Sequence, residues 1–201
     1  MNTIHVYVEG GGPAKRTQSR LREGFDAFCR ELKSLLGNRL RFVVAGSRDE
    51  AYQDFRTALR SNPERVNLLL VDLEAAVNGL PRAHLQNRDP HWDLSPAGED
   101  RVHLMAQCLE AWIVADPDAL AGYYGQNFNR NALPVRQNLE QELKQSIYAA
   151  LKNATRQTQK GTYAKVQHAR DLLMVVSPQN AQQRCPHCRR FFDTVKLFKH
   201  Q

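Results

Sequence analysis

The first 75 residues alternate between short apolar runs and longer amphipathic segments. The runs at 4–8, 40–45 and 67–73 are rich in aliphatic residues and predict strands. The segments at 16–36 and 47–59 repeat apolar residues every three or four positions, which predicts helices. Because the helices alternate with the strands, we expect right-handed crossovers and a mainly parallel sheet flanked by helices. The predicted fold class is therefore α/β.

The remainder of the chain predicts mostly helices. The stretch 75–99 contains three prolines and two glycines and predicts a long loop, which is uncommon unless it is functional or mobile. The helices expected after it cover about 100–115, 116–124, 138–152 and 163–175, with one or two short helices after Pro178. We therefore expect an α/β core over 1–125 and a helical C-terminal extension over 126–201 packed on that core.

Acidic residues follow two of the predicted strands. Glu9 comes directly after the first strand, and Asp72 and Glu74 come at the end of the third. The ends of parallel strands are where functional groups gather in such sheets. Carboxylates brought together there repel one another unless a cation lies between them. Asp72 and Glu74 are two positions apart, so on an extended chain they share a face and predict a Mg²⁺ or Mn²⁺ site.

Three glycines, Gly10, Gly11 and Gly12, follow Glu9 directly. Glycine lets the backbone turn tightly and approach a phosphate closely, so we treat them as candidate phosphate-binding residues. Neither the dinucleotide-binding glycine pattern nor the P-loop lysine is present. The carboxylate of Glu9 suits metal binding or proton transfer better than simple phosphate binding. An ordinary solvated turn is the alternative.

Four further residues are candidates for the same site. Glu110 could be a third metal ligand or part of a structural salt bridge. Lys160 and Lys165 flank a Gly-x-Tyr sequence and could neutralise a phosphate oxygen in the transition state, or simply form a solvated basic stretch. Arg48, at the start of the second helix, could bind phosphate or pair with Asp49 or Glu50.

Composition favours a polyanionic substrate. The 201-residue chain has a net charge of +7, and positive surface attracts phosphate. Hydrophobic residues make up 42%, enough for a substantial core, yet no apolar run approaches the roughly 20 residues of a membrane helix. The chain begins with a strand rather than a signal peptide, so we expect a cytoplasmic protein that does not bind membranes.

The four cysteines are expected to be reduced in that compartment. Cys185 and Cys188 form one Cys-x-x-Cys pair, with His187 inside it and His200 eleven residues beyond Cys188. A structural zinc site normally needs a second pair of ligands at short spacing. We therefore do not expect zinc here.

A carboxylate after the first strand and an Asp-x-Asp-like pair after the third resemble the Toprim domain of topoisomerases, primases and overcoming-lysogenization-defect nucleases. Glu74 stands where that pattern usually has Asp, which keeps the charge but lengthens the side chain. A closer resemblance, over nearly the whole chain, is to a bacterial Toprim-like family of uncharacterised proteins. It rests on Tyr7–Gly12, Leu21–Phe25, Gly46-Ser47-Arg48, Leu69–Glu74, His103–Trp112, Ala115-Asp116 and Lys160–Lys165.

Such proteins are similar to companions encoded beside ABC/AAA-type ATPases in anti-phage systems. The resemblance implies a nuclease effector whose activity the ATPase partner controls. In this hypothesis Asp72 and Glu74 hold Mg²⁺ or Mn²⁺, Glu9 is a further ligand or the general base, and Lys160 or Lys165 stabilises charge on the phosphate.

Two other hypotheses remain. The site could be degenerate, leaving a regulatory module that docks on an ATPase. Alternatively, the protein could be a metal-dependent phosphodiesterase or nucleotide-binding enzyme that acts on a small molecule, with the 75–99 loop as a lid. The basic charge favours a polymer such as nucleic acid over a small substrate. Whether the chain forms a homo-oligomer is left open by the sequence.

Overall fold

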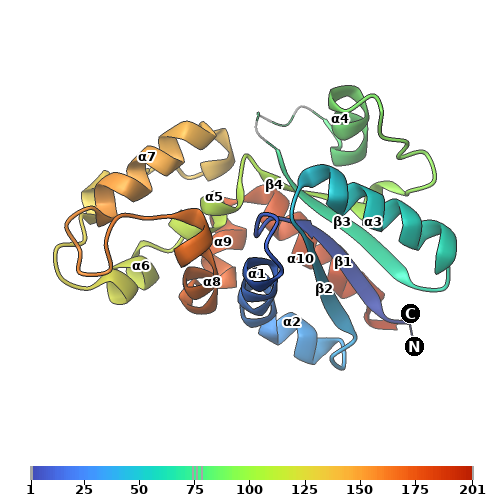
Figure 1. The fold of residues 1–201 in the computed structure, drawn as a ribbon, viewed down its shortest axis with the longest axis horizontal. Helices are drawn as coiled ribbons and strands as arrows, with labels where there is room; N and C mark the ends of the chain where they lie inside the picture. Colours follow the sequence, from blue (N-terminus) through green and yellow to red (C-terminus); the bar gives the residue numbers. More distant parts are fainter. Residues whose placement is uncertain (1, 74, 76, 78, 201) are drawn as a thin grey trace.

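The computed structural model describes residues 2–73, 75, 77 and 79–200. Within these residues four strands form one parallel sheet in the order β2-β1-β3-β4. The strands are β1 (Ile4–Glu9), β2 (Leu40–Ala45), β3 (Val66–Leu73) and β4 (Val102–Ala106). Helices flank the sheet and make up most of the C-terminal half (Figure 1). The predicted α/β class with a parallel sheet is confirmed.

At least one helix connects each pair of strands that are consecutive in sequence, as parallel pairing requires. They are α1 (Lys15–Phe28), α2 (Arg30–Leu35), α3 (Arg48–Ser61), α4 (Pro81–Arg88), α5 (Leu109–Val114), α6 (Pro117–Tyr124), α7 (Lys144–Thr155), α8 (Lys165–Val175), α9 (Pro178–Arg184) and α10 (Pro186–Leu197). Short 3₁₀ turns cover Glu99–Arg101, Arg130–Ala132, Leu139–Gln141 and Phe198–His200. Among the described residues, none of these helices is long and apolar enough to cross a membrane.

Two apolar layers cover the two faces of the sheet. Alternate side chains of a strand point to opposite faces. Accordingly, Leu68 and Leu70 of β3 join the core cluster that contains α1, α5 and α10, whereas Leu69 and Val71 join the cluster that contains α3. All eight residues of β3 are buried because both layers cover this strand. A buried β3 places its C-terminal end, with Asp72, deep in the molecule.

Side-chain caps begin two of the helices. Ser47 and Glu50 form the capping box of α3: the Glu50 amide donates to Ser47 Oγ at 3.2 Å, and the Ser47 amide donates to Glu50 Oε2 at 2.7 Å. The side chain of Asp116 caps α6 by accepting a hydrogen bond from the Ala119 amide at 3.1 Å.

The helix predicted over 100–115 is wrong. Residues Val102–Ala106 form β4, which pairs with β3, and only Leu109–Val114 are α-helical. A short apolar run fits either a buried strand or a buried helix, and here pairing with β3 decides. His103, expected in the first helical turn, is therefore a buried strand residue.

Other boundaries differ for local reasons. The helix predicted over 16–36 is two helices joined at Cys29, and the 75–99 stretch contains α4, which begins at Pro81 as its first residue. The helix predicted over 138–152 begins only at Lys144, after a 3₁₀ turn.

The two halves of the chain share one apolar core cluster. Phe28 of α1 stacks on Trp112 of α5 at a ring-centroid distance of 5.8 Å and meets Phe192 of α10 edge-on at 5.8 Å. Residues 126–201 thus supply part of the layer that covers the sheet.

We expect Phe28→Ala to lower the free energy of unfolding by about 3–5 kcal/mol, because it leaves a cavity between both halves. Urea unfolding followed by circular dichroism would measure this loss, and a single transition is expected for the whole chain. Leu35→Ala is the matched control, since Leu35 is 42% exposed, and it should cost less than about 1 kcal/mol. A large loss in the control, or two separate transitions, would contradict this packing.

Candidate active site

The carboxyl ends of β1 and β3 bring Glu9 and Asp72 together. The two strands are neighbours in the sheet and run parallel, so their last residues lie side by side. The Asp72 amide donates a hydrogen bond to Glu9 Oε2 at 3.1 Å. Residues separated by 63 positions in sequence thus meet, as the strand pattern led us to expect. Glu74 lies outside the described residues.

Asp72 is a buried carboxylate with two different donors. Its side chain is 2% exposed. Oδ1 accepts a hydrogen bond from the amide of Leu109, the first residue of α5, at 3.0 Å, and Oδ2 accepts one from Lys165 Nζ at 3.0 Å. Burial raises the pKa of Asp72, although the positive charge of Lys165 opposes that shift. The Lys165 ammonium is therefore the main charge that stabilises the ionised form.

Glu110, in the first turn of α5, completes a buried cluster with Asp72 and Lys165, which we call the buried triad. Its side chain has no exposed surface. Oε1 accepts a hydrogen bond from the Tyr163 hydroxyl at 2.8 Å, while Oε2 accepts none from any described residue and lies 3.9 Å from Lys165 Nζ. An unpaired buried carboxylate oxygen is costly, which makes this one a candidate for binding a proton, a water or a cation.

Lys165 is the first residue of α8 and remains charged. Burial acts to lower its pKa, but the charges of Asp72 and Glu110 outweigh burial and raise it. One ammonium group thus lies among two buried carboxylates. The triad carries a net negative charge when both carboxylates are ionised.

Glu9 is poised to exchange a proton near neutral pH. Burial, and then the negative charge of Asp72, raise its pKa to about 7, while Lys165 and Arg48 act in the opposite direction. A carboxylate with this pKa can accept a proton from water at physiological pH, which is what a general base requires.

The glycine loop Gly10–Gly12 turns the chain from β1 into α1. All three glycines have positive φ, at 140°, 78° and 63°. A Cβ on Gly11 would come within 2.8 Å of the Gln18 backbone, so at this position the loop packs against α1 without room for a side chain. The side-chain amide of Gln18 donates to the Gly12 carbonyl oxygen at 2.9 Å and holds the loop there.

A pocket of about 180 Å³ lies between the glycine loop and α8. We call it the α8 pocket. Its lining includes Glu9, the glycine loop, Arg20, Lys165 and Arg170. Three basic residues and one carboxylate therefore line the space beside the loop, and two of the basic residues, Arg20 and Arg170, also form ion pairs with Asp171. This setting suits a phosphate group with a nearby metal ion or proton acceptor.

Arg48 occupies a different position from the one predicted. Its guanidinium donates to the backbone carbonyl of Asp72, forms an ion pair with Asp89 and lies 4.8 Å from the centre of the Trp92 ring. It does not pair with Asp49 or Glu50. Arg48 thus fastens the α4 segment to the end of β3 rather than lining the α8 pocket.

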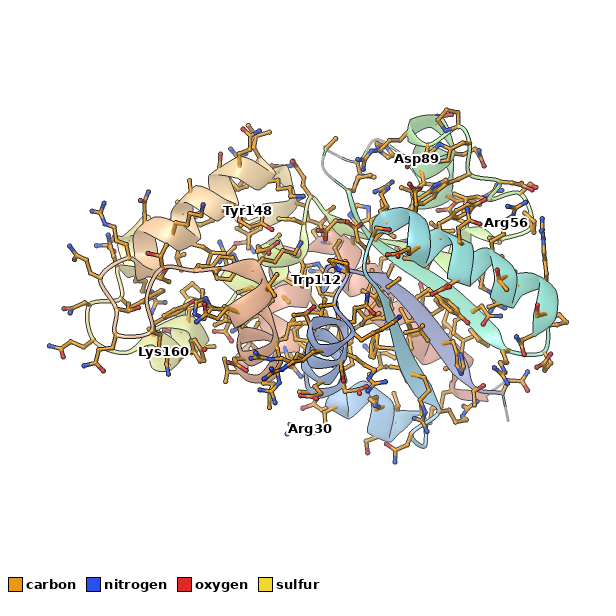
Figure 2. The ribbon with its side chains drawn as sticks, in the orientation of Figure 1. Arg30, Arg56, Asp89, Trp112, Tyr148 and Lys160 are labelled. Carbon is orange, nitrogen blue, oxygen red and sulfur yellow. The ribbon has the colours of Figure 1, made fainter. Side chains whose placement is uncertain are left out.

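Lys160 also lies apart from the triad. Lys160 belongs to the loop between α7 and α8 (Figure 2). Its ammonium lies 4.7 Å from the centre of the ring of Tyr123. Of the two candidate lysines, only Lys165 contacts the carboxylates. The thiols of Cys185 and Cys188 are free and buried, and burial raises the pKa of both.

Sequence reasoning missed several residues of the site. Tyr163 holds Glu110, and Arg20 and Arg170 line the α8 pocket. Tyr163 lies within the Lys160–Lys165 motif, two positions before Lys165, so the sequence contained a signal that could have placed it at the site. Nothing in the sequence pattern distinguished Arg20 and Arg170 from other surface arginines.

The described residues meet the needs of a metal ion only in part. No three His, Cys, Asp or Glu side chains among them converge closely enough to hold one. Mg²⁺, however, commonly uses one or two carboxylates together with water and substrate phosphate oxygens. Glu9 and Asp72 supply such a pair, and the unpaired oxygen of Glu110 lies 3.9 Å from Lys165 Nζ. This donor set fits an ion that the substrate helps to hold.

Comparison with known proteins identifies a family but no characterised relative. A family model described as Domain of unknown function (DUF4276) matches residues 8–196. The chain belongs to this family. No curated protein and no solved structure matches the chain. The matched region begins at the end of β1 and covers the other three strands and most of the helical half, so it contains Glu9, the triad and α7.

The first prediction for this site tests whether Lys165 stabilises the protein by neutralising the buried carboxylates. We expect Lys165→Met to destabilise the protein by about 3–5 kcal/mol at pH 8, because the buried carboxylates lose their counter-ion. The loss should shrink at pH 5, where Asp72 can bind a proton. Thermal unfolding at both pH values measures this, with Lys152→Met, an exposed lysine on α7, as the control. A loss below about 1 kcal/mol at pH 8 would show that the triad is not stabilising.

The second prediction for this site tests the raised pKa of Glu9 in the metal-free protein. Its folded-state pKa of about 7 exceeds the model-peptide value of 4.5, so folding favours the protonated form. Stability is therefore expected to fall as pH rises between those values. Glu9→Gln should remove this dependence, making the change in unfolding free energy from pH 5 to pH 8 smaller by about 2 kcal/mol. Urea unfolding across that range measures it. Parallel pH curves for both proteins would contradict the assignment.

Proposed function

We propose that this protein is a metal-dependent phosphodiester hydrolase that acts on nucleic acid. The observation that carries the proposal is the meeting of Glu9 and Asp72 at neighbouring strand ends, beside Lys165 and a glycine-lined cationic pocket. Proton transfer, metal binding and phosphate binding can all take place within this one cluster. The net charge of +7 favours a polyanion as the substrate.

Asp72 is the proposed metal ligand, with Glu110 and Glu74 as further candidates, and of its two roles considered above Glu9 is assigned that of the general base. Bound Mg²⁺ or Mn²⁺ would supply positive charge to the phosphate oxygens and lower the pKa of water. The ammonium of Lys165 already lies on Asp72 Oδ2. A cation and Lys165 therefore compete for the same oxygen, and Lys165 becomes available to the substrate when it leaves that oxygen.

The side chains then have separate roles in hydrolysis. Glu9 accepts the proton of the attacking water while the new P–O bond forms and the ester P–O bond breaks. Lys165, shared between the triad and the α8 pocket, stabilises the charge that develops on the phosphate. The glycine loop lets the phosphate approach the backbone, and the leaving oxygen takes up a proton from solvent.

The resemblance to Toprim-like proteins supports the same chemistry and adds a partner. We propose that an ABC/AAA-type ATPase controls the activity and that the pair functions in anti-phage defence. Assays of the isolated chain should therefore be repeated with an ATPase encoded beside its gene.

One observation favours a second candidate function. The Lys165 ammonium already neutralises Asp72 and lies near Glu110, so the cluster is stable without a metal ion. A protein in which Lys165 never leaves would be a regulatory module that docks on an ATPase. Metal binding separates the two functions, because the regulatory module has no need of it.

The test combines metal binding and cleavage. We expect Mn²⁺ binding by calorimetry, and Mn²⁺- or Mg²⁺-dependent cleavage of fluorophore-labelled oligonucleotides. Asp72→Asn should abolish metal binding, and Glu9→Gln should reduce cleavage by at least about 100-fold. Glu64→Gln is the matched control because the Glu64 side chain is 65% exposed and precedes β3, at the opposite end of that strand from Asp72, and it should retain full activity.

Cleavage that persists in Asp72→Asn would overturn the proposed site. A wild-type protein that neither binds Mn²⁺ nor cleaves any oligonucleotide, with or without the ATPase, would favour the regulatory module.

A further inference from the structure

The segment from Leu143 to Arg170 has an unusual charge composition. It contains six basic residues and no acidic one, between Glu142 and Asp171: Lys144, Lys152, Arg156, Lys160, Lys165 and Arg170. It comprises α7, the following loop and the first turns of α8. Most of the protein's net charge of +7 is thus concentrated in 28 residues beside the candidate active site.

One face of α7 carries an exposed and mostly polar stripe. Gln145, Ala149, Lys152 and Arg156 follow one another at spacings of three or four residues, which places them along one side of the helix. All four are exposed. The stripe runs along the helix axis and presents cations and an amide to solvent, the side chains that contact nucleic-acid backbones.

A second pocket, which we call the α7 pocket, opens beside this stripe. It has a volume of about 780 Å³, and its lining includes Gln107, Lys144, Gln145, Tyr148 and Lys152. That volume lies in the range of sites for small organic ligands, and an aromatic ring with nearby amides suits a nucleobase. The pocket begins at Gln107, the residue directly after β4.

The α7 pocket and the α8 pocket flank the buried triad. Lys165, a member of the triad, lines the α8 pocket. In the α7 pocket, the ring of Tyr148 lies 6.3 Å from the ring of Tyr163, whose hydroxyl donates to Glu110 Oε1 of the triad at 2.8 Å. Both pockets therefore adjoin residues of the triad.

The triad is also recessed. Asp72 is 2% exposed and Glu110 is fully covered, so a phosphate must enter the molecule to reach them. A stiff duplex cannot bend its backbone into such a site without unpairing, whereas a single strand can insert one nucleotide.

We infer that the protein binds single-stranded nucleic acid along the α7 stripe, with a base in the α7 pocket and an adjoining phosphate in the α8 pocket. This inference rests on the proposed function and extends it by naming the form of the substrate and the surface that holds it. Lys152 and Arg156 contact the backbone outside the site, and Tyr148 stacks on the base.

Binding is tested without cleavage, by fluorescence anisotropy in EDTA. The probes are labelled 20-nucleotide oligothymidine and oligouridine, and a 20-base-pair duplex. We expect at least one single-stranded probe to bind at least 10-fold more tightly than the duplex. Lys152→Glu combined with Arg156→Glu should weaken that binding at least 10-fold and reduce the salt dependence, by about 0.7 in the logarithmic slope for each lost phosphate contact.

The matched control is Arg30→Glu combined with Arg60→Glu. Both arginines are exposed, and this double variant makes the same change in net charge on α2 and at the end of α3 (Figure 2 labels Arg30, away from α7). It should weaken binding less than threefold. Tyr148→Ala should cost about 10-fold, and Tyr148→Phe should retain binding because it keeps the stacking ring.

Three results would overturn the inference: equal losses in the two double variants, duplex binding as tight as single-strand binding, or no binding of any probe. If the protein binds single strands through α7 but shows no metal-dependent cleavage, the proposed catalysis is rejected and the inferred binding surface is supported. Cleavage that the α7 variants do not affect would leave the catalysis standing and reject the surface.

Discussion

The placement of one ammonium group among buried carboxylates is the constraint on which the rest of the structure depends. Asp72 and Glu110 are 2% and 0% exposed, and removing ionised carboxylates from water is too costly unless a counter-ion accompanies them. Lys165 is that counter-ion, and it comes from α8, 93 residues beyond Asp72. The helical half must therefore dock on the sheet to neutralise the end of β3. The fold and the candidate site therefore both depend on the neutralisation of the buried carboxylates by Lys165.

Asp72 connects four other elements of the molecule. Its amide contacts Glu9 of β1, its carbonyl accepts from Arg48 of α3, and its carboxylate contacts α5 and α8. Through Arg48 and Asp89, the α4 segment is tied to the same strand end. Asp72 is thus linked to α8 through its carboxylate and to α4 through its backbone carbonyl. Partner control of the site could act through either contact.

Sequence reasoning predicted what local pattern determines. The strands containing Glu9 and Asp72 were clear from apolar runs, and parallel pairing followed from the alternation of helices and strands. The order β2-β1-β3-β4, which makes β1 and β3 neighbours, was not predicted. The helix expected at 100–115 was wrong because a short apolar run does not distinguish a strand from a helix, and pairing with β3 settled it. Contacts over long sequence separations had no local signal. Thus Lys165 rather than Lys160 reaches the carboxylates, and Arg48 pairs with Asp89 rather than with its neighbours.

The acid-free segment explains why one stretch of chain can serve both stability and binding. An acidic residue near Lys165 would compete for its ammonium and weaken the neutralisation of Asp72. The same absence of acids leaves Lys152 and Arg156 unopposed within their segment of sequence, so positive charge gathers on the surface of α7. A phosphate drawn along this surface toward the site has to compete with Asp72 and Glu110 for the ammonium of Lys165. The competition for Lys165 between Asp72 and a phosphate then links substrate entry to the release of a carboxylate oxygen that a metal ion can take.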